Sequence, residues 1–210
     1  MLLLEVERKF PRLTTKLHLA PTYHHPPFRT LNYLGTKTLH DTYYDFPSSS
    51  SPTGIHPHYL STQGIWIRKR NDTWQAKIRR GGDYTNSQFQ ELSSSAEISS
   101  YLATITGIGN PEKVNFGLVA MADFVTVRES WVADGEFTIV QDEMDFGHTV
   151  GEVEMEWRGE CKGDVEGFRR KKMEEMDGRI GEFMTRYGWA FCGGTAKGKL
   201  SAYLEMRKGR

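Results

Sequence analysis

The chain has 210 residues, and its 27 lysines and arginines balance its 27 aspartates and glutamates, so the formal net charge is zero. This length suits one domain, and zero net charge argues against a general nucleic-acid-binding protein, which usually carries excess positive charge. The 2 cysteines make no disulfide framework, and no apolar run approaches the ~20 residues that cross a membrane. We therefore expect a cytoplasmic monomer with neither a nucleic-acid nor a membrane partner.

Alternation of apolar and polar residues predicts mainly β structure. The dipeptide Asn71-Asp72 is a turn signal between two alternating segments, and Gly81-Gly82 interrupts the pattern after them. Residues 47–57 are rich in serine, proline and glycine, which is typical of a loop. The expected strands cover residues 2–10, 40–46, 64–70, 74–80, 87–92, 124–131, 136–141 and 149–157.

Capping signals and apolar spacing predict a few helices. Ser94 followed by Glu97 forms a capping box, and Gly107 is placed to end the helix that this box begins. A longer apolar stripe at helical spacing contains several glycines, which weaken the prediction and are expected to kink the helix. The expected helices cover residues 15–19 (ended by Pro21), 95–106, 164–187 and from Lys199 through Leu204. Because we find no repeat or linker, residues 1–210 are expected to form one domain.

Charged side chains are sorted by sign along the expected strands. Side chains two residues apart on a strand share a face. The sets that share a face are Glu5, Glu7 and Lys9; Trp66, Arg68 and Arg70; Lys77 and Arg79; Phe124, Thr126, Arg128 and Ser130; and Glu152, Glu154 and Glu156. The simplest interpretation places these charges in water and the apolar faces on a core. Like charges repel on neighbouring surface positions, however, and Arg8 and Lys69 place charge on the supposed core face.

A sheet that closes into a tunnel, with its charged faces inward, accounts for both observations. Carboxylates on one wall would hold Mg²⁺ or Mn²⁺, which are hard cations that prefer oxygen ligands. Arginine and lysine on the other wall would hold phosphate oxygens. Because a metal-bridged polyphosphate would neutralise both walls, the pattern predicts an α+β fold that binds a polyphosphate.

The segment Glu5-Val6-Glu7-Arg8-Lys9 resembles the ExExK signature of the CYTH superfamily, which includes class IV adenylyl cyclases and thiamine triphosphatases. That signature alone is weak, but further segments resemble animal thiamine triphosphatases in the same order. They are residues 41–45, 66–70, 74–77, 125–128, 145–147, 150–154 and 199–204. The resemblance therefore covers most of the chain.

The resemblance implies an antiparallel eight-stranded β-barrel, the triphosphate tunnel, with flanking helices. It also implies a metal-dependent phosphohydrolase that cleaves an organic triphosphate, with thiamine triphosphate as the leading candidate. Implied ligands of Mg²⁺ or Mn²⁺ are Glu5, Glu7, Glu152 and Glu154, and implied triphosphate-binding residues are Lys9, Arg68, Arg70, Arg128 and Lys199. Trp66 would stack on the thiamine moiety, Glu91 would lie near the organic end, and Tyr43 and Lys77 would help to generate the attacking hydroxide. Val140 falls where an acidic ligand is expected, so we predict that Asp142 replaces it.

Several alternatives stay open at this stage. The same scaffold would serve an inorganic triphosphatase, a nucleoside triphosphatase, an adenylyl cyclase or a non-catalytic polyphosphate-binding module. The full acidic set argues against the last, because simple anion binding needs no carboxylates. Trp66 favours an organic substrate, although packing in the tunnel wall is an equal alternative. A lysine kept neutral by its surroundings would be able to act as a base. We interpret His24, His25, His56 and His58 as loop residues and residues 169–172 as a solvated helix face.

Overall fold

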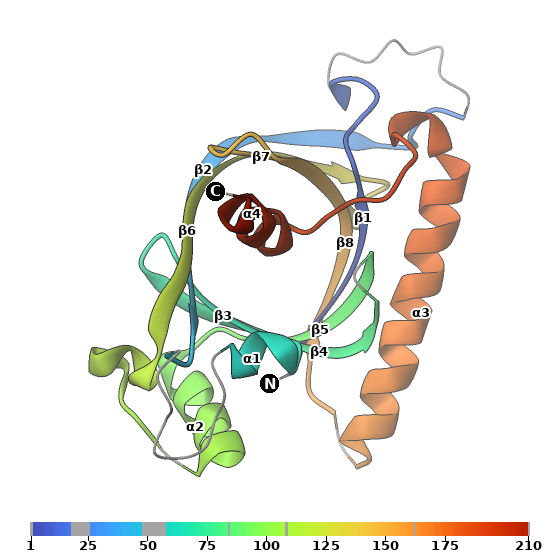
Figure 1. Cartoon of the computed structure of the whole chain (residues 1–210). Helices are drawn as coiled ribbons and strands as arrows, with labels where there is room; N and C mark the ends of the chain where they lie inside the picture. Colours follow the sequence, from blue (N-terminus) through green and yellow to red (C-terminus); the bar gives the residue numbers. More distant parts are fainter. Residues whose placement is uncertain are drawn as a thin grey trace.

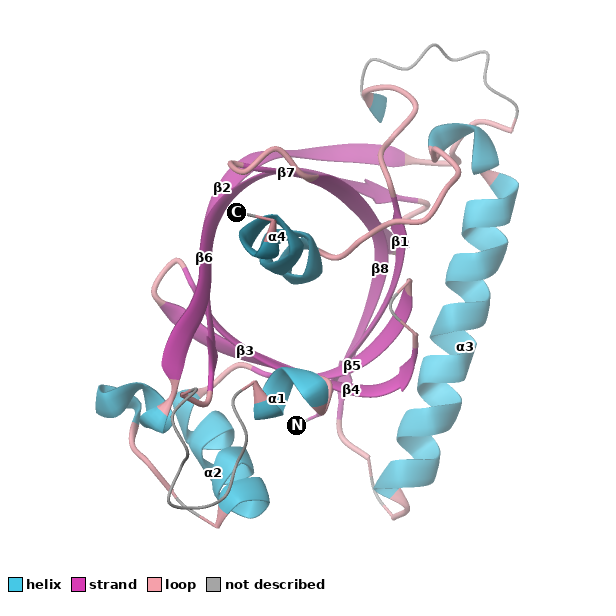
Figure 2. Ribbon diagram, in the orientation of Figure 1, coloured by secondary structure: helices cyan, strands magenta, loops and turns pink. Residues whose placement is uncertain are grey.

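The strands of the chain close into one antiparallel barrel in the order β1-β5-β4-β3-β2-β6-β7-β8, viewed along its axis in Figures 1 and 2. This computed structural model describes residues 2–17, 26–47, 58–83, 85–107, 109–161 and 163–209. The strands are β1 (Leu2–Phe10), β2 (Leu31–Asp45), β3 (Ile65–Arg70), β4 (Thr73–Gly82), β5 (Asn86–Leu92), β6 (Val119–Ala133), β7 (Phe137–Met144) and β8 (Thr149–Gly159). The predicted eight-stranded barrel with flanking helices is therefore confirmed.

The helices lie outside the barrel wall, apart from the last one. They are α1 (Tyr59–Thr62), α2 (Ser95–Thr106), α3 (Val165–Arg186) and α4 (Lys199–Lys208), with short 3₁₀ segments at Glu112–Gly117 and Gly188–Ala190. Figure 1 shows α3 alongside the β1 and β8 side of the barrel and α4 across its opening. Among the described residues, no helix has both the length and the apolar character that crossing a membrane requires.

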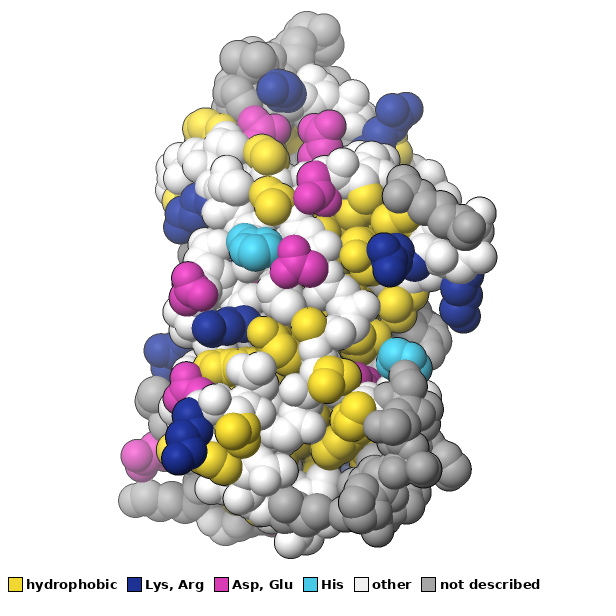
Figure 3. Space-filling view, turned by 60° about the vertical axis from the view of Figure 1, so that its left-hand side comes forward, with side chains coloured by type: hydrophobic (Ala, Val, Ile, Leu, Met, Phe, Trp, Pro, Cys, Tyr) yellow, Lys and Arg dark blue, Asp and Glu magenta, His cyan; other side chains and the backbone are white. Residues whose placement is uncertain are grey.

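Two strands, β2 and β6, exceed their predicted lengths by the most. β2 and β6 pair from Leu31 opposite Ala133 to Asp45 opposite Val119, with two shifts of register on the way. Much of the added length is exposed, so it lacks the alternation of apolar and polar residues that marks a half-buried strand. Figure 3 shows this side of the molecule, where apolar and charged side chains intermingle on the surface.

Most of the hydrophobic core lies between the barrel and its helices, because most apolar side chains of the strands point outward. One cluster joins β1, β6, β7 and β8 to α3 and includes Val6, Ile139 and Ile180, each fully buried. A second cluster joins β3 and β4 to α1 and α2 and includes Ile67 and Ile98. Burying these outer faces against helices leaves the inner, charged faces to line the lumen.

Arg8 and Lys69, the two charged residues that interrupt the apolar faces of their strands, both have partners outside the barrel. Arg8 donates two hydrogen bonds to Asp177 of α3, at 2.8 and 2.9 Å. Its guanidinium crosses α3 at Gly181, where a Cβ would lie 2.8 Å from the Arg8 Nη1 atom. Lys69 pairs with Asp72 at 3.5 Å, and its ammonium lies 6.0 Å from the centre of the Trp74 ring. These contacts explain why the two strands break the simple alternation.

The long helix α3 differs from its prediction in two respects. It runs without interruption from Val165 to Arg186, although it contains the glycines that were expected to kink it. Arg169 was predicted on a solvated face but is only 8% exposed, and it donates to Gln90 of β5 at 2.8 Å. Its long side chain reaches over the barrel wall, which a pattern of charges on the helix alone does not reveal.

Two further predictions fall largely outside the described residues. Of the short helix predicted at residues 15–19, residues 15 and 16 are not helical and residues 18 and 19 lie outside the described part. Most of the predicted loop at residues 47–57 also lies outside it, together with His24, His25 and His56. His58 immediately precedes α1.

The core between α3 and the barrel predicts a stability difference. Ile180→Ala should lower the free energy of unfolding by about 2–5 kcal/mol, because it opens a cavity at a fully buried site. Val165→Ala, at a residue of the same helix that is 44% exposed, should change it by less than ~0.5 kcal/mol. Urea unfolding followed by circular dichroism measures both values. Equal effects of the two substitutions would contradict the assignment of this core.

Candidate active site

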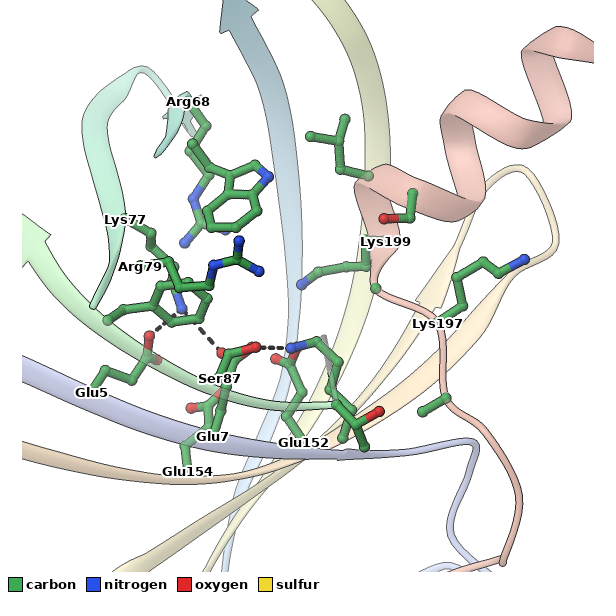
Figure 4. Close-up of a pocket in the computed structure, with 18 of the residues that line it drawn as sticks. Glu5, Glu7, Arg68, Lys77, Arg79, Ser87, Glu152, Glu154, Lys197 and Lys199 are labelled. Atoms are coloured by element: carbon green, nitrogen blue, oxygen red, sulfur yellow. Dashed lines mark hydrogen bonds and ion pairs between the residues drawn. The ribbon is translucent and has the colours of Figure 1, made fainter. Parts of the chain in front are cut away.

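The barrel encloses a cavity of about 790 Å³, bordered by the inward faces of the strands and by the start of α4 (Figure 4). The alternating charged faces identified in the sequence do point into this lumen. The predicted site residues that line it are Glu5, Glu7, Lys9, Tyr43, Trp66, Arg68, Arg70, Lys77, Glu91, Arg128, Glu152, Glu154 and Lys199. Asp142, the remaining one, lies in the wall and has no exposed surface.

Three glutamates form a carboxylate cluster on neighbouring strands. Glu5 and Glu7 share a face of β1, and Glu154 of β8 pairs directly with Glu7 across the sheet. One carboxylate oxygen from each lies within 4.8 Å of the others, and all three side chains are buried. Carboxylate oxygens at this spacing are the donor set that hard divalent cations prefer.

The negative charge of this carboxylate cluster is incompletely compensated. Burial raises the pKa of Glu154 well above its ordinary value, and repulsion from Glu5 and Glu152 adds to the effect against the attraction of Arg128. Burial also raises the pKa of Glu5, and attraction to Lys77 offsets this only in part. Both groups therefore hold a proton more tightly than a solvated glutamate does.

Glu152 of β8 has different surroundings, although it is the next residue on the same strand face. Its carboxylate lies 3.8 Å from the Lys9 ammonium and 3.5 Å from the Arg128 guanidinium. Burial alone would raise the pKa of Glu152, but attraction to Lys199, Lys9 and Arg128 outweighs it and lowers the pKa strongly. Glu152 is therefore held by cations and is not part of the carboxylate cluster.

On the opposite wall, a buried aspartate holds the arginines of β3. Asp41 has no exposed surface, and its two oxygens accept hydrogen bonds from Arg70 at 2.6 Å each. Arg68 lies 4.0 Å from the same carboxylate and also donates to Gln75 at 3.0 Å and to the Tyr43 hydroxyl at 3.4 Å. The two guanidiniums are thus fixed before any ligand binds. Asp41 lies in a segment that resembles the family, but this role was not predicted, because it depends on the pairing of Asp41 with Arg70 between β2 and β3.

Asp142 holds a second pair of cations in the same way. Its oxygens accept two hydrogen bonds from Arg128, at 2.7 Å each, and one from Lys199 at 2.6 Å. Lys199 is the first residue of α4, so this buried contact also ties α4 to the barrel. The sequence predicted Asp142 as a metal ligand, whereas the structure places its oxygens on these two cations and outside the carboxylate cluster. Val140 faces Glu152 across the sheet and is buried.

Lys77 of β4 is surrounded by carboxylates. Its ammonium forms an ion pair with Glu5 and lies 3.3 Å from both Glu7 and Glu91. Burial alone would lower the pKa of Lys77, but the three carboxylates outweigh burial and raise the pKa well above its ordinary value. Lys77 therefore keeps its positive charge, whereas the sequence suggested a neutral lysine that acts as a base. Tyr43, its predicted partner, contacts Arg68 instead.

An aromatic pair forms another part of the cavity wall. Trp66 of β3 and Phe89 of β5 meet edge to face, with ring centres 5.5 Å apart. The guanidinium of Arg79 lies 6.0 Å from the centre of the Trp66 ring, and Arg79 also lines the cavity. Arg79 was expected on the same strand face as Lys77, but neither Arg79 nor Phe89 was among the predicted site residues. The signal in the sequence was their position two residues from predicted site residues, because Arg79 follows Lys77 on β4 and Phe89 precedes Glu91 on β5 at that spacing.

The pKa of Glu154 predicts how stability depends on pH. The pKa of Glu154 in the folded protein exceeds its ordinary value of 4.5. Binding of a proton to Glu154 therefore stabilises the fold, and this contribution is complete at pH values below 4.5. This contribution is lost as the pH rises through the folded-state pKa. In the presence of a chelator, the melting temperature of Glu154→Gln should therefore be close to that of wild type at pH 5 and higher than that of wild type at pH 8.

Differential scanning fluorimetry at the two pH values measures this effect. Glu143→Gln is the matched control, because Glu143 is exposed on β7. A difference between Glu154→Gln and wild type that does not change with pH would show that the carboxylate is fully compensated in the folded protein.

Comparison with known proteins adds independent information. No protein-family model matches the chain. Human (Homo sapiens) thiamine triphosphatase is 32% identical over 171 residues, which cover 72% of this chain and 67% of that protein. This relative belongs to the superfamily whose signature the first strand resembles.

Two solved structures share the fold over nearly the whole chain. A protein from Pyrococcus horikoshii has a TM-score of 0.51 at 15% identity, covering 97% of this chain and 99% of that one. A protein from Hippeastrum, described as a proposed adenylyl cyclase that reveals a dominant triphosphatase activity, also has a TM-score of 0.51, at 17% identity. The second match covers 98% of this chain and 96% of that one. At these identities the likeness shows the fold alone.

Proposed function

This chain belongs to the CYTH superfamily, and we propose that it is a metal-dependent phosphohydrolase that cleaves thiamine triphosphate to thiamine diphosphate and phosphate. The observation that carries the proposal is the lumen, in which a buried carboxylate cluster faces a set of fixed cations. A cation bound between these walls with a triphosphate would compensate both. The human relative supports thiamine triphosphate as the substrate.

The carboxylate cluster fits Mg²⁺ or Mn²⁺. Glu5, Glu7 and Glu154 offer three oxygens within 4.8 Å of one another, and the raised pKa values of Glu5 and Glu154 reflect negative charge that a cation would compensate. When bound, such a cation would stabilise phosphate charge and acidify water. Ligation by Glu152 and Asp142 stays a prediction, because both carboxylates contact cationic side chains here.

Five cations would hold the triphosphate. Phosphoryl transfer depends mainly on positioning and on stabilising charge, so groups fixed in advance are effective. Bidentate pairs with Asp41 and Asp142 fix Arg70 and Arg128, and Asp142 also fixes Lys199. The proposed triphosphate-binding residues are Lys9, Arg68, Arg70, Arg128 and Lys199.

Lys77 and Tyr43 are proposed to act near the reacting phosphate. Lys77 carries a positive charge among Glu5, Glu7 and Glu91, so we propose that it acts through that charge and not as a neutral base. Tyr43 would help to orient the attacking water together with Arg68, which donates to its hydroxyl. Glu91 and Trp66 would lie towards the organic end of the substrate.

The carboxylate cluster predicts dependence of activity on a metal and on its ligands. Glu7→Gln should lower kcat/KM for thiamine triphosphate roughly 100-fold or more while the fold is retained, because the amide keeps the shape but loses the charge. Phosphate release at limiting Mg²⁺ or Mn²⁺, and in chelator, measures this loss. Glu143→Gln, on the exposed side of β7, is the control.

A panel of thiamine triphosphate, inorganic triphosphate and ATP separates the alternatives. Full activity of wild type in chelator, or near-normal turnover of Glu7→Gln, would contradict the metal assignment. Preference for inorganic triphosphate or ATP would exclude thiamine triphosphate as the main substrate but keep the triphosphatase. Tight binding of all three substrates without turnover would identify a binding module.

Trp66 predicts selectivity for the organic group. It shares a strand face with Arg68 and Arg70, so it should contact the organic group that carries the phosphates. Stacking of a cationic ring on tryptophan contributes roughly 0.5–2 kcal/mol. Trp66→Ala should therefore raise the KM for thiamine triphosphate several-fold and change hydrolysis of inorganic triphosphate little.

Steady-state kinetics with the two substrates make this an internal comparison. The inorganic substrate has nothing to stack, so it reports any general damage to the site. An equal loss with both substrates would reduce Trp66 to a packing residue of the wall.

A further inference from the structure

The aromatic pair of the cavity already has a cation of the protein beside each ring. The Arg79 guanidinium lies 6.0 Å from the centre of the Trp66 ring, and the Lys77 ammonium lies 5.1 Å from the centre of the Phe89 ring. These are the positions in which an aromatic face attracts a positive charge. Three carboxylates surround the Lys77 ammonium, so the positive charge that a cationic ligand meets at this pair is that of Arg79 at the Trp66 face.

Arg79 is held against Trp66 by the local backbone. Its amide donates a hydrogen bond to the Gly64 carbonyl at 2.8 Å, which pairs the end of β4 with the residue just before β3. Its side chain passes over Gly64, where a Cβ would lie 3.0 Å from the Arg79 Nε atom and 3.1 Å from its Cβ. Figure 4 shows the guanidinium directed into the cavity from this position.

The charge and shape of Arg79 affect cationic and neutral rings in opposite ways. A guanidinium stays charged at every physiological pH, so it repels a thiazolium ring placed on the Trp66 face. The same planar group stacks favourably on a neutral aromatic ring such as a nucleobase, which also stacks on tryptophan. A neutral base would thus gain contacts where a cationic ring would meet repulsion.

We propose that Arg79 is a specificity-determining residue that weakens, without abolishing, the stacking of a cationic organic group on Trp66 and that favours a neutral nucleobase there. The chain would then accept purine nucleoside triphosphates beside thiamine triphosphate, with the triphosphate in the same place. This inference rests on the proposed function, because it assumes that one triphosphate site serves both substrates.

The test compares kcat/KM for thiamine triphosphate, ATP and inorganic triphosphate in three variants. Arg79→Ala should raise the ratio of thiamine triphosphate to ATP on the order of 10-fold, the range of cation–aromatic effects. Arg79→Lys, which keeps the charge, should stay closer to wild type in this ratio. Arg80→Ala is the matched control, because Arg80 is exposed and donates to Gln90 at 2.9 Å on the outer face. Inorganic triphosphate should change little in every variant.

Two results would overturn the inference. An equal loss with all three substrates in Arg79→Ala would make Arg79 a phosphate ligand, and an unchanged substrate ratio at normal rates would deny it any selective role. Wild type that hydrolyses none of the three would instead refute the proposed function. In that case, calorimetric titration with thiamine diphosphate and ADP decides the inference: the affinity ratio should rise in Arg79→Ala, and an unchanged ratio overturns it.

Discussion

Compensation of charge inside a closed barrel is the constraint on which the rest of this structure depends. A buried charge needs a partner, because the desolvation of an isolated ion costs more than the fold can supply. Here carboxylates and cations from neighbouring strands compensate one another across the lumen. Since most charged side chains of the strands point inward, most apolar side chains point outward, and the larger part of the core forms against covering helices. The positions of α2 and α3 therefore follow from what the barrel contains.

The compensation is uneven, and this unevenness distinguishes the two walls. Asp41 and Asp142 are wholly buried and hold their cations through short, bidentate contacts. Burial raises the pKa of Glu154, and the attraction of Arg128 offsets this effect only in part. Part of the negative charge of Glu154 is therefore left without compensation. One wall is thus a rigid set of positive groups, and the other is receptive to added positive charge. A metal-bridged triphosphate is the kind of ligand that suits both.

Helix α4 takes part in the compensation of charge in the lumen through its first residue, Lys199. Lys199 enters the wall and contacts Asp142, while Tyr203 packs on Phe124 and Phe146. The helix lies across the barrel opening in Figure 1, so it limits access from one end. The aromatic pair adjoins the charged site, because Phe89 pairs with Glu5 across the sheet and the Lys77 ammonium lies 5.1 Å from the centre of the Phe89 ring.

The sequence by itself determined the strands that line the lumen and the side chains that face it. Alternation along a strand is local and has a period of two residues, so Glu5 with Glu7 and Arg68 with Arg70 could be assigned to common faces. The sorting of their charges by sign, together with Arg8 on the opposite face, indicated a closed barrel from the sequence alone. The family resemblance agreed with this interpretation.

Only the tertiary structure decided which charges meet. Asp41 contacts Arg70 from a strand joined to β3 by a long segment, and Asp142 contacts Lys199 from another element altogether. The position of Arg79 beside Trp66 likewise depends on the register between β3 and β4. Register and closure of a barrel are set by packing between segments that are distant in sequence, whereas the pattern along one strand carries information about that strand alone.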